Sequence, residues 1–257
     1  MVTRADFFRP SIWTRLGYAL LIVYVIYAAA TLGLSWERIE RGVGYGAKFL
    51  AGFFPPNFTK SDLIPGLLES LQIAFLASLF GTLIAIPLSV LSARNLMPAF
   101  ITWPARIIII LCRTFHPVIV AIIAVKAVGF GAMAGVIALT VASVGFVGKL
   151  LAEAIEEISK KQIEAIRATG ASFMNTIIFG VVPQVMNRFI GFVAYETDSN
   201  LRHSTIVGVV GAGGIGGTLF SAFQRYDYDF VAGISIAIIA LVMLGEVIQI
   251  YVKRVFR

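Results

Sequence analysis

The chain has 257 residues, of which 58% are hydrophobic and 14% are charged, and its formal net charge is +7. Soluble domains carry about 25% charged residues, so this chain has too few charges to cover a water-facing surface, and we expect a membrane protein. Its single cysteine excludes an internal disulfide, and its two histidines are too few for a histidine-built metal site. We therefore expect no bound metal on this chain.

Six apolar stretches are each long enough to cross a bilayer as a helix, which takes about 20 residues. They cover residues 16–34, 65–91, 107–128, 132–151, 183–210 and 230–252. We expect an all-α integral membrane protein with six transmembrane helices, forming a single transmembrane domain over 1–257. Its core is expected at 65–252, preceded at 1–64 by an additional span and an outer segment. The aromatic residues and prolines of that outer segment suit the membrane–water boundary.

The placement of lysine and arginine indicates the orientation, because cytoplasmic segments are enriched in both. With the N-terminus inside, most of the 21 basic residues fall on the cytoplasmic side or its flanks. These are Arg4, Arg9, Arg15, Arg94, Arg106, Arg113, Lys149, Lys160, Lys161, Arg167, Arg188, Lys253, Arg254 and Arg257. Topology in a lipid bilayer thus explains the positive charge, and we expect no nucleic-acid partner. A cleavable signal peptide is the alternative for the first span, although its removal would leave the termini on opposite sides.

The long segment between the fourth and fifth spans, residues 153–183, lies on the cytoplasmic side in this topology. Glu156 and Glu157 precede Lys160 and Lys161 by four residues, so we expect ion pairs that extend the fourth helix into water. A short helix-forming run follows, and it leads into a glycine corner and a second helix.

Gly170 is placed to end the short helix, and Ser172 is placed to cap the next one. Three apolar residues at four-residue intervals predict a stripe on that second helix, which should end at Pro183. They are Phe173, Ile177 and Val181. This arrangement is either a loop on the membrane surface or a rigid knob that a cytoplasmic partner binds.

The knob sequence resembles the EAA loop of ABC importer permeases. That family has E-A-A, three residues, glycine, nine residues and then I-x-L-P. Here Glu164, Gly170 and Pro183 keep the register, whereas Ile166, Gly180 and Val182 depart from it. The resemblance implies a coupling loop that seats in a groove of a separate ATP-hydrolysing subunit. Its residues would be Glu164, Ala165, Ile166, Arg167, Gly170 and Pro183.

A closer resemblance, to the phosphonate-type branch of these permeases, covers most of the chain. It is carried by residues 53–58 (FFPPNF), 70–74 (SLQIA), 92–95 (SARN), 164–171 (EAIRATGA) and 199–208 (SNLRHSTIVG). The resemblance implies a type I importer architecture in a bacterial cytoplasmic membrane, importing phosphonates or related oxyanions such as phosphite. It further implies a homodimer, an ATPase subunit that holds ATP and magnesium, and an external solute-binding protein.

The fifth span carries ionisable and polar residues, which are costly in lipid and face a bundle interior or an aqueous path. Asp198 and Arg202 lie one turn apart and are expected to pair, which is the structural alternative to contact with substrate. The functional hypothesis is an anion path, because a guanidinium matches oxyanions bidentately. Its candidate residues are Asp198, Asn200, Arg202, His203, Ser204, Thr205 and Arg113.

Gly211, Gly213 and Gly216 have the G-x-G-x-x-G spacing of a dinucleotide-binding turn. That turn needs alternating strands and helices and an acidic residue about twenty positions later, and this chain provides neither. We therefore interpret these residues, with Gly214, as packing or gating glycines in a compact, bendable element at the outer end of the fifth span.

An enzymatic function is not expected. The stretch 143–150 (SVGFVGKL) lacks the first glycine and the final hydroxyl residue of a phosphate-binding loop. ATP hydrolysis, if it drives transport, must therefore occur on a partner chain. The alternatives are an ion-coupled secondary anion transporter, which would usually show inverted repeats, and an importer for another small solute such as an amino acid.

Overall fold

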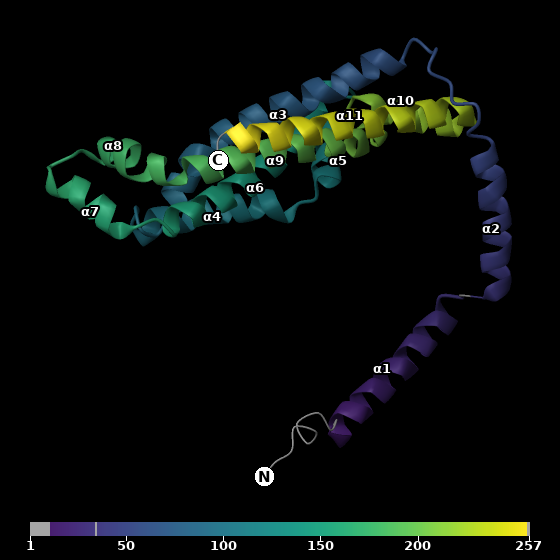
Figure 1. Cartoon of the computed structure of the whole chain (residues 1–257), viewed down its shortest axis with the longest axis horizontal. Coiled ribbons are helices and arrows are strands. Elements are labelled where there is room, and N and C mark those ends of the chain that lie inside the picture. The colour runs from purple at the N-terminus through teal and green to yellow at the C-terminus, as the bar shows by residue number, and fades with distance from the viewer. Residues whose placement is uncertain (1–10, 34, 256–257) are drawn as a thin grey trace. The chain divides into compact units, whose positions relative to one another are not determined.

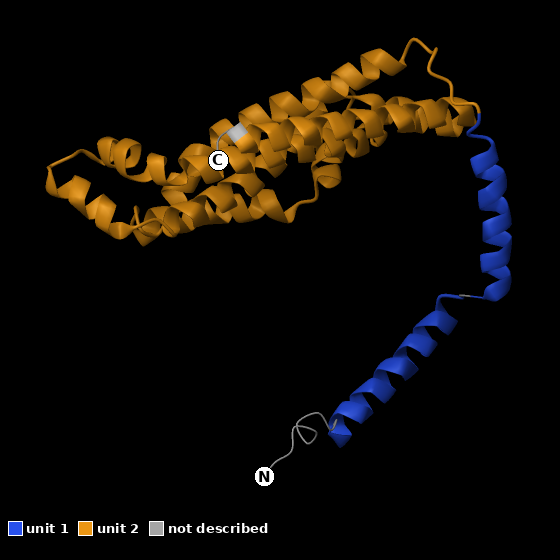
Figure 2. Ribbon diagram, viewed as in Figure 1, with its two compact units in different colours: residues 1–54 blue, residues 55–257 orange. Residues whose placement is uncertain are grey.

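The computed structural model describes residues 11–33 and 35–255, so that Arg4, Arg9 and Arg257 of the cytoplasmic set lie outside the described residues. Its regular elements are all helices, as expected from the sequence. The chain divides into two compact units, residues 1–54 and 55–257 (Figure 2). Residues 55–64, which the sequence grouped with the N-terminal segment, thus belong to the larger unit.

The smaller unit contains two helices. α1 (Ile12–Thr31) begins after Ser11, whose hydroxyl accepts a hydrogen bond from the amide of Trp13. α1 is long and apolar enough to cross a membrane, which agrees with the first predicted span, and none of its residues is buried. α2 (Trp36–Ala51) occupies most of the predicted interfacial segment, for which no helix had been predicted.

The larger unit is a bundle of long helices with short helices at its two ends (Figure 1). In chain order it contains α3 (Leu63–Ser92), α4 (Ala99–Thr114), α5 (Pro117–Val128), α6 (Ala132–Glu156), α7 (Lys160–Ala168), α8 (Phe173–Thr176), the π-helical turn η2 (Ile177–Val181), α9 (Val182–Val209), α10 (Ile215–Gln224) and α11 (Tyr228–Val255). α7 and α8 lie at one end, which we call the knob end, and α10 lies toward the other (Figure 1).

Close packing of α3 on α6 forms the centre of the bundle, and small residues make it possible. A side chain at Gly81 of α3 would collide with the Cβ of Ser143 on α6. Buried Ile73, Ala77 and Leu139 belong to one apolar cluster at this contact. Because lipid gives little hydrophobic drive between membrane helices, such close backbone approach is a main source of their association.

Four of the predicted spans in the larger unit correspond to single helices of sufficient length and apolarity: α3, α6, the α8–η2–α9 stretch and α11. The third predicted span, 107–128, is not a single straight helix. It is divided between α4 and α5, whose axes differ by 92°. Pro117 has no amide hydrogen to continue α4. Instead His116 caps α5, its Nδ1 accepting from the amide of Val118 at 3.3 Å.

The segment before α3 is fixed to the corner between α10 and α11. The amide of Asn57 donates to the carbonyl of Asp229 at 3.0 Å, and Lys60 forms an ion pair with Asp227. The Asn57 backbone lies so close to Gly233 that any side chain there would collide with it. These contacts explain why residues from 55 onward fold with the larger unit.

Candidate functional site

The knob, which we define as residues 157–181, is held to the bundle by a few apolar side chains. Ile163 of α7 and Val181 of η2 are both buried, in one cluster with Ile155 of α6 and Val185 of α9. Glu164, Ala165 and Arg167 lie on the solvent-exposed part of α7, and Ile166 is half-buried. The knob thus presents one charged face outward while an apolar face anchors it.

Gly170 forms the corner that the sequence predicts. α7 ends at Ala168, and Gly170 follows with φ +78°. A Cβ at Gly170 would meet nothing within 4 Å, so the requirement for glycine is conformational and not steric. Ser172 then caps α8, its hydroxyl accepting from the amide of Asn175 at 3.4 Å, as predicted.

The helix after this corner differs from the prediction. It does not end at Pro183: the helical path from Phe173 to Val209 is continuous over 37 residues. Pro183 lies in the first turn of α9, directly after η2, whose wider turn accommodates an additional residue. This turn also breaks the expected apolar stripe, because Phe173 is exposed whereas Val181 is buried.

The two glutamates at the end of α6 have other partners than those predicted. Glu156 forms an ion pair with Arg106 of α4, with 2.5 Å between Oε1 and Nη2. Glu157 forms one with Arg188 of α9, at 2.5 Å. α6 ends at Glu156, so the expected pairs to Lys160 and Lys161 are replaced by links between helices.

Asn200 of α9 lies at the centre of a buried polar network. Its Nδ2 donates to Ser78 of α3 at 2.9 Å and to Ser143 of α6 at 2.7 Å. Ser143 in turn donates to Oε1 of Glu196 at 2.7 Å. Asn200 and Ser143 are fully buried, so this network joins three helices inside the bundle. Sequence analysis predicts no partner for either serine, because hydroxyl groups on separate helices carry no local signal of pairing.

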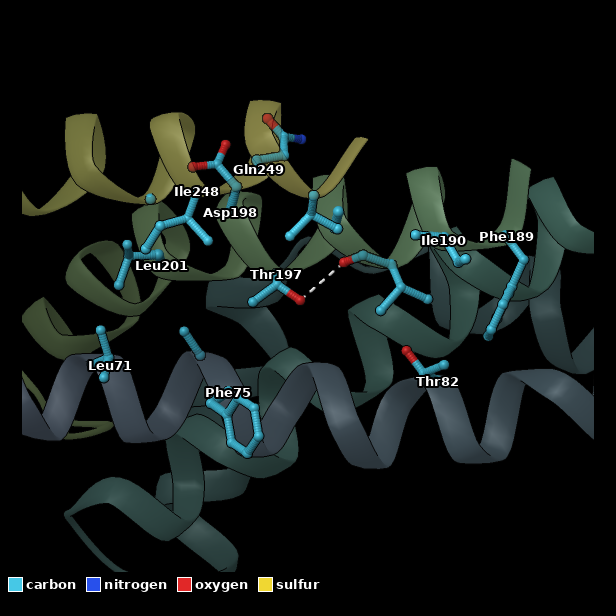
Figure 3. A pocket seen from close by; sticks show the side chains of 15 residues that line it. Leu71, Phe75, Thr82, Phe189, Ile190, Thr197, Asp198, Leu201, Ile248 and Gln249 are labelled. Carbon is cyan, nitrogen blue, oxygen red and sulfur yellow. Dashed lines mark hydrogen bonds between the residues drawn. The ribbon is translucent and has the colours of Figure 1, made fainter. Parts of the chain in front are cut away.

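Asp198 and Arg202 form the predicted ion pair, with 2.6 Å between Oδ2 and Nη1. The Asp198 side chain is 5% exposed and that of Arg202 is 42% exposed, so the aspartate is held inside while the guanidinium reaches the surface. Asp198 also lines a cavity of about 520 Å³ between α3, α9 and α11 (Figure 3). Oδ1 of Asp198 has no hydrogen-bond partner among the described residues.

That cavity has mostly apolar walls. Leu71 and Phe75 of α3 lie on one side of it and Ile248 of α11 on the other, while Thr197 of α9 projects between them (Figure 3). The hydroxyl of Thr197 is occupied by a 2.9 Å bond to the carbonyl of Val193. The cavity therefore offers few free donors for an anion.

The remaining path candidates on α9 are not all on one surface. Ser204 is buried and donates to the carbonyl of Leu201 at 2.7 Å, and Asn200 is occupied by the serines described above. His203 and Thr205 are half-buried, and Arg202 is the exposed member. The structure therefore separates an inward-facing group of polar side chains from the outward-facing guanidinium.

The glycines after α9 form a tight reversal of the chain into α10. Gly211, Gly213 and Gly214 all have positive φ, between +78° and +89°. A Cβ at Gly214 would lie 2.5 Å from the hydroxyl of Ser70, which accepts from the amide of Ile215 at 2.9 Å. This part of the chain is thus compact, as the sequence predicts, and its packing against α3 explains the small residues.

Gly216 allows α10 to fold back on α9. Any side chain at this position would collide with the carbonyl oxygen of Thr205. Gly208 faces it from α9, where a Cβ would lie 2.9 Å from the Cα of Gly216. The G-x-G-x-x-G spacing therefore serves backbone packing between two helices.

Arg113, the last path candidate, lies in the final turns of α4 beside the break before α5. Its side chain is exposed and lines a second cavity, of about 470 Å³, together with Arg106 and Lys149. It is remote in sequence from Arg202, and the sequence had not linked it to these two basic residues. The described residues contain no cluster of histidine, cysteine and acidic side chains that could hold a metal ion.

Similarity to known proteins agrees with this architecture. The model of the family "Binding-protein-dependent transport system inner membrane component" matches residues 85–257. The phosphite transport system permease protein PtxC of Stutzerimonas stutzeri is 33% identical over 95% of this chain and 90% of its own length. The phosphate-import permease protein PhnE of Mycolicibacterium smegmatis is 38% identical over 75% of this chain, which spans 37% of that protein.

The fold is also that of a solved transporter. A chain from an inward-facing conformation of the MetNI methionine ABC transporter superposes with a TM-score of 0.66, at 23% identity, covering 76% of this chain and 96% of that one. The family match covers more than half of the chain, and the bundle has the corresponding fold. The chain therefore belongs to the family of binding-protein-dependent transport system inner membrane components.

Proposed function

We propose that this chain is the membrane-spanning subunit of an ATP-driven importer for phosphonate-like oxyanions such as phosphonate or phosphite. The observation that carries the proposal is the knob, a rigid surface with exposed Glu164, Ala165 and Arg167. It is anchored by buried Ile163 and turned by Gly170 at positive φ. The relatives named as phosphite and phosphate permeases support the class of substrate.

In the proposed topology α4 and α5 together count as one broken span, which gives six spans with both termini in the cytoplasm. The knob end is then cytoplasmic, and the glycine reversal before α10 faces outward. The excess of lysine and arginine near the knob end supports this orientation. The proposed location is a bacterial cytoplasmic membrane.

The proposed partners are those that the family implies. A dimer of ATPase subunits, which hold ATP and magnesium, binds the knob through Glu164, Ala165, Ile166 and Arg167, with Gly170 and Pro183 shaping that surface. A second copy of this chain completes the path, and a solute-binding protein delivers the oxyanion outside. This chain itself is non-catalytic and binds no cofactor.

Within the membrane, Arg202 is the proposed contact for the passing oxyanion, because its guanidinium is exposed while its partner Asp198 is buried. An oxyanion competes with Asp198 for this fork, so the ion pair opens during passage. His203 and Thr205 flank Arg202 on the same helix, and Arg113 lies nearer the knob end. Asn200 and Ser204 position α9 from within, and Gly211, Gly213, Gly214 and Gly216 set how far its outer end can move.

Uptake by the reconstituted importer tests this proposal. The permease, its ATPase and its binding protein are placed in liposomes, and ATP-dependent entry of radiolabelled methylphosphonate or phosphite is measured. Glu164→Lys is expected to abolish both uptake and co-purification of the ATPase. Glu37→Lys, a charge reversal at an exposed glutamate of α2, is the matched control and should change neither.

Two results would contradict the proposal at different levels. Proton-driven uptake in vesicles that lack ATP and both partners would favour an ion-coupled secondary transporter and overturn the importer assignment. A solute-binding protein that binds an amino acid more tightly than any phosphorus oxyanion would overturn the substrate class and leave the importer assignment intact.

A further inference from the structure

The larger unit contains a cavity of about 470 Å³ between the end of α3, α4 and α6, which we call the basic pocket. Its lining includes Arg106, Arg113 and Lys149, together with Ser92, Thr114 and Glu153. Glu156, which is not among the lining residues, pairs with Arg106. Three cations therefore face two carboxylates here, which leaves one positive charge in excess.

The excess charge is located on Arg113. Arg106 pairs with Glu156 at 2.5 Å, and Lys149 pairs with Glu153 at 3.4 Å. None of the ion pairs among the described residues includes Arg113. An arginine without a carboxylate partner is free to offer its planar fork to an anion.

Arg113 also lies well inside the bundle's length. Its backbone contacts α6 at Gly145, where a Cβ would come within 2.7 Å of the Arg113 nitrogen. From Gly145 to Glu156 at the knob end, α6 rises roughly 16 Å at 1.5 Å per residue. The basic pocket thus extends from the knob end toward the middle of the membrane, a depth at which unpaired charge is costly unless water or an anion is present.

The pocket is large enough to hold an anion. Its remaining lining residues include apolar Ile109, Ile110 and Ala152, and 470 Å³ is large compared with the roughly 30 Å³ of one water molecule. A tetrahedral phosphorus oxyanion has the size and the paired oxygens that an arginine fork binds bidentately, and Lys149 and Arg106 can share its charge.

We propose that the basic pocket is a binding site for a phosphoryl or phosphonyl oxyanion that is reached from the knob end. The chemistry fits two sources: a free oxyanion on its way into the cytoplasm, or the phosphate of an inner-leaflet lipid. The inference rests on the proposed function only for the side of the membrane that the pocket faces. Its site, Arg113 with Arg106 and Lys149, is distinct from Arg202 on α9.

Thiol chemistry tests the charge of the pocket directly. Thr114→Cys is introduced with Cys112→Ser into the complete importer, in inside-out vesicles. Rates of modification, each divided by the same reagent's rate with a free thiol in solution, are compared for a negatively and a positively charged methanethiosulfonate of equal size. We expect the negative reagent to react about thirty times faster, because one excess positive charge attracts it by about 1 kcal/mol and repels the positive reagent by as much, and we expect Arg113→Gln to remove the difference.

Matched variants separate the pocket from general effects. Arg113→Lys keeps the charge and should keep the preference. Arg94→Gln removes a nearby cation that does not line the pocket and should leave the preference unchanged. If the importer with Thr114→Cys fails to assemble, Ile110→Cys reports on the same lining. Equal rates for the two reagents at both reporter positions would overturn the proposal.

Protection then identifies the source of the oxyanion. In phosphatidylcholine nanodiscs, slowing of the modification by added methylphosphonate identifies a free oxyanion. Slowing of both reagents only when phosphatidylglycerol, whose phosphate is not neutralised by a choline, replaces phosphatidylcholine identifies a lipid phosphate. No protection by either refutes the site even if ATP-driven uptake is intact, whereas protection without uptake supports the site while the proposed function fails.

Discussion

The side-chain amide of Asn200 on α9 donates a 2.7 Å hydrogen bond to the hydroxyl of Ser143 on α6, in a fully buried environment. Ser143 in turn donates to Glu196, and Asn200 also donates to Ser78 on α3. These hydrogen bonds therefore link three helices. Interhelical hydrogen bonds in membrane proteins contribute about 0.6 kcal/mol each on average. The network thus fixes the position of α9 more by specificity than by strength.

Removing the hydroxyl of Ser143 is expected to weaken this network without disturbing the packing at Gly81. Ser143→Ala retains the Cβ that fills the space at Gly81, but it leaves Glu196 and Asn200 without their shared partner. We expect a loss of about 1–2 kcal/mol in the free energy of unfolding, measured by denaturant titration in detergent. Ser199→Ala, on α9 next to Asn200 but outside the network, is the control, and an equal loss there would contradict the assignment.

The corner at Gly170 predicts a conformational requirement in the knob. Gly170→Ala places a Cβ at φ +78°, which costs about 1–2 kcal/mol, although there is room for the atom itself. We expect binding of the ATPase subunit to weaken about tenfold, measured as the dissociation constant in nanodiscs. Gly170→Asn, which tolerates this conformation better, should recover much of the binding, whereas Gly191→Ala should have no effect. A Gly170→Ala variant that binds normally would remove the conformational argument.

The contact between α9 and α10 predicts that two neighbouring glycines differ in tolerance. A Cβ at Gly216 would collide with the backbone of Thr205, whereas one at Gly217 would come no closer than 3.5 Å to the carbonyl of Gly208. Gly216→Ala is therefore expected to cost about 1–3 kcal/mol of stability, and Gly217→Ala is expected to cost little. The midpoint of thermal unfolding of the two purified variants measures the difference, and similar midpoints would argue against close α9–α10 packing.

The exposed apolar residues of α2 predict that this helix lies along the membrane surface. Ile39, Val43 and Leu50 are exposed and recur at helical spacing, and Trp36 begins the helix. Trp13→Phe and Trp103→Phe leave Trp36 as the only tryptophan. We expect its fluorescence to be quenched more by lipids brominated near the headgroup than by lipids brominated at the chain ends. Val43→Glu is expected to reduce that quenching, and Arg41→Glu, on the charged face, is the control. Equal quenching at all depths would exclude an interfacial position.

Long apolar stretches made most of the fold predictable from the sequence. Such stretches are marked by length and composition alone, and α1, α3, α6, α9 and α11 all agree with that expectation. The missing amide hydrogen of Pro117 indicates a kink in the third span, and the structure has its break there, although Pro87 and Pro104 lie inside unbroken helices. What differs at Pro117 is the side-chain cap supplied by His116, a local contact that residue type does not reveal.

The candidate site was predictable where the chemistry is local. The corner at Gly170 and the pair of Asp198 with Arg202 depend on residues within one turn, and both agree with the structure. The partner of Glu156 was not predictable, because Arg106 is fifty residues away in the chain and a nearer lysine was available. Long-range pairing depends on which helices are neighbours, and hydropathy does not encode that.

The unbroken helical path from Phe173 to Val209 has a mechanical consequence. It makes the second half of the knob and the Arg202 guanidinium parts of a single rod. A force applied to that half of the knob therefore rotates or tilts the whole rod, unless the rod deforms. Deformation is easiest at the π-helical turn Ile177–Val181, where the helix is wound less tightly. The stiffness of that one turn determines how much of a movement at the knob reaches Asp198.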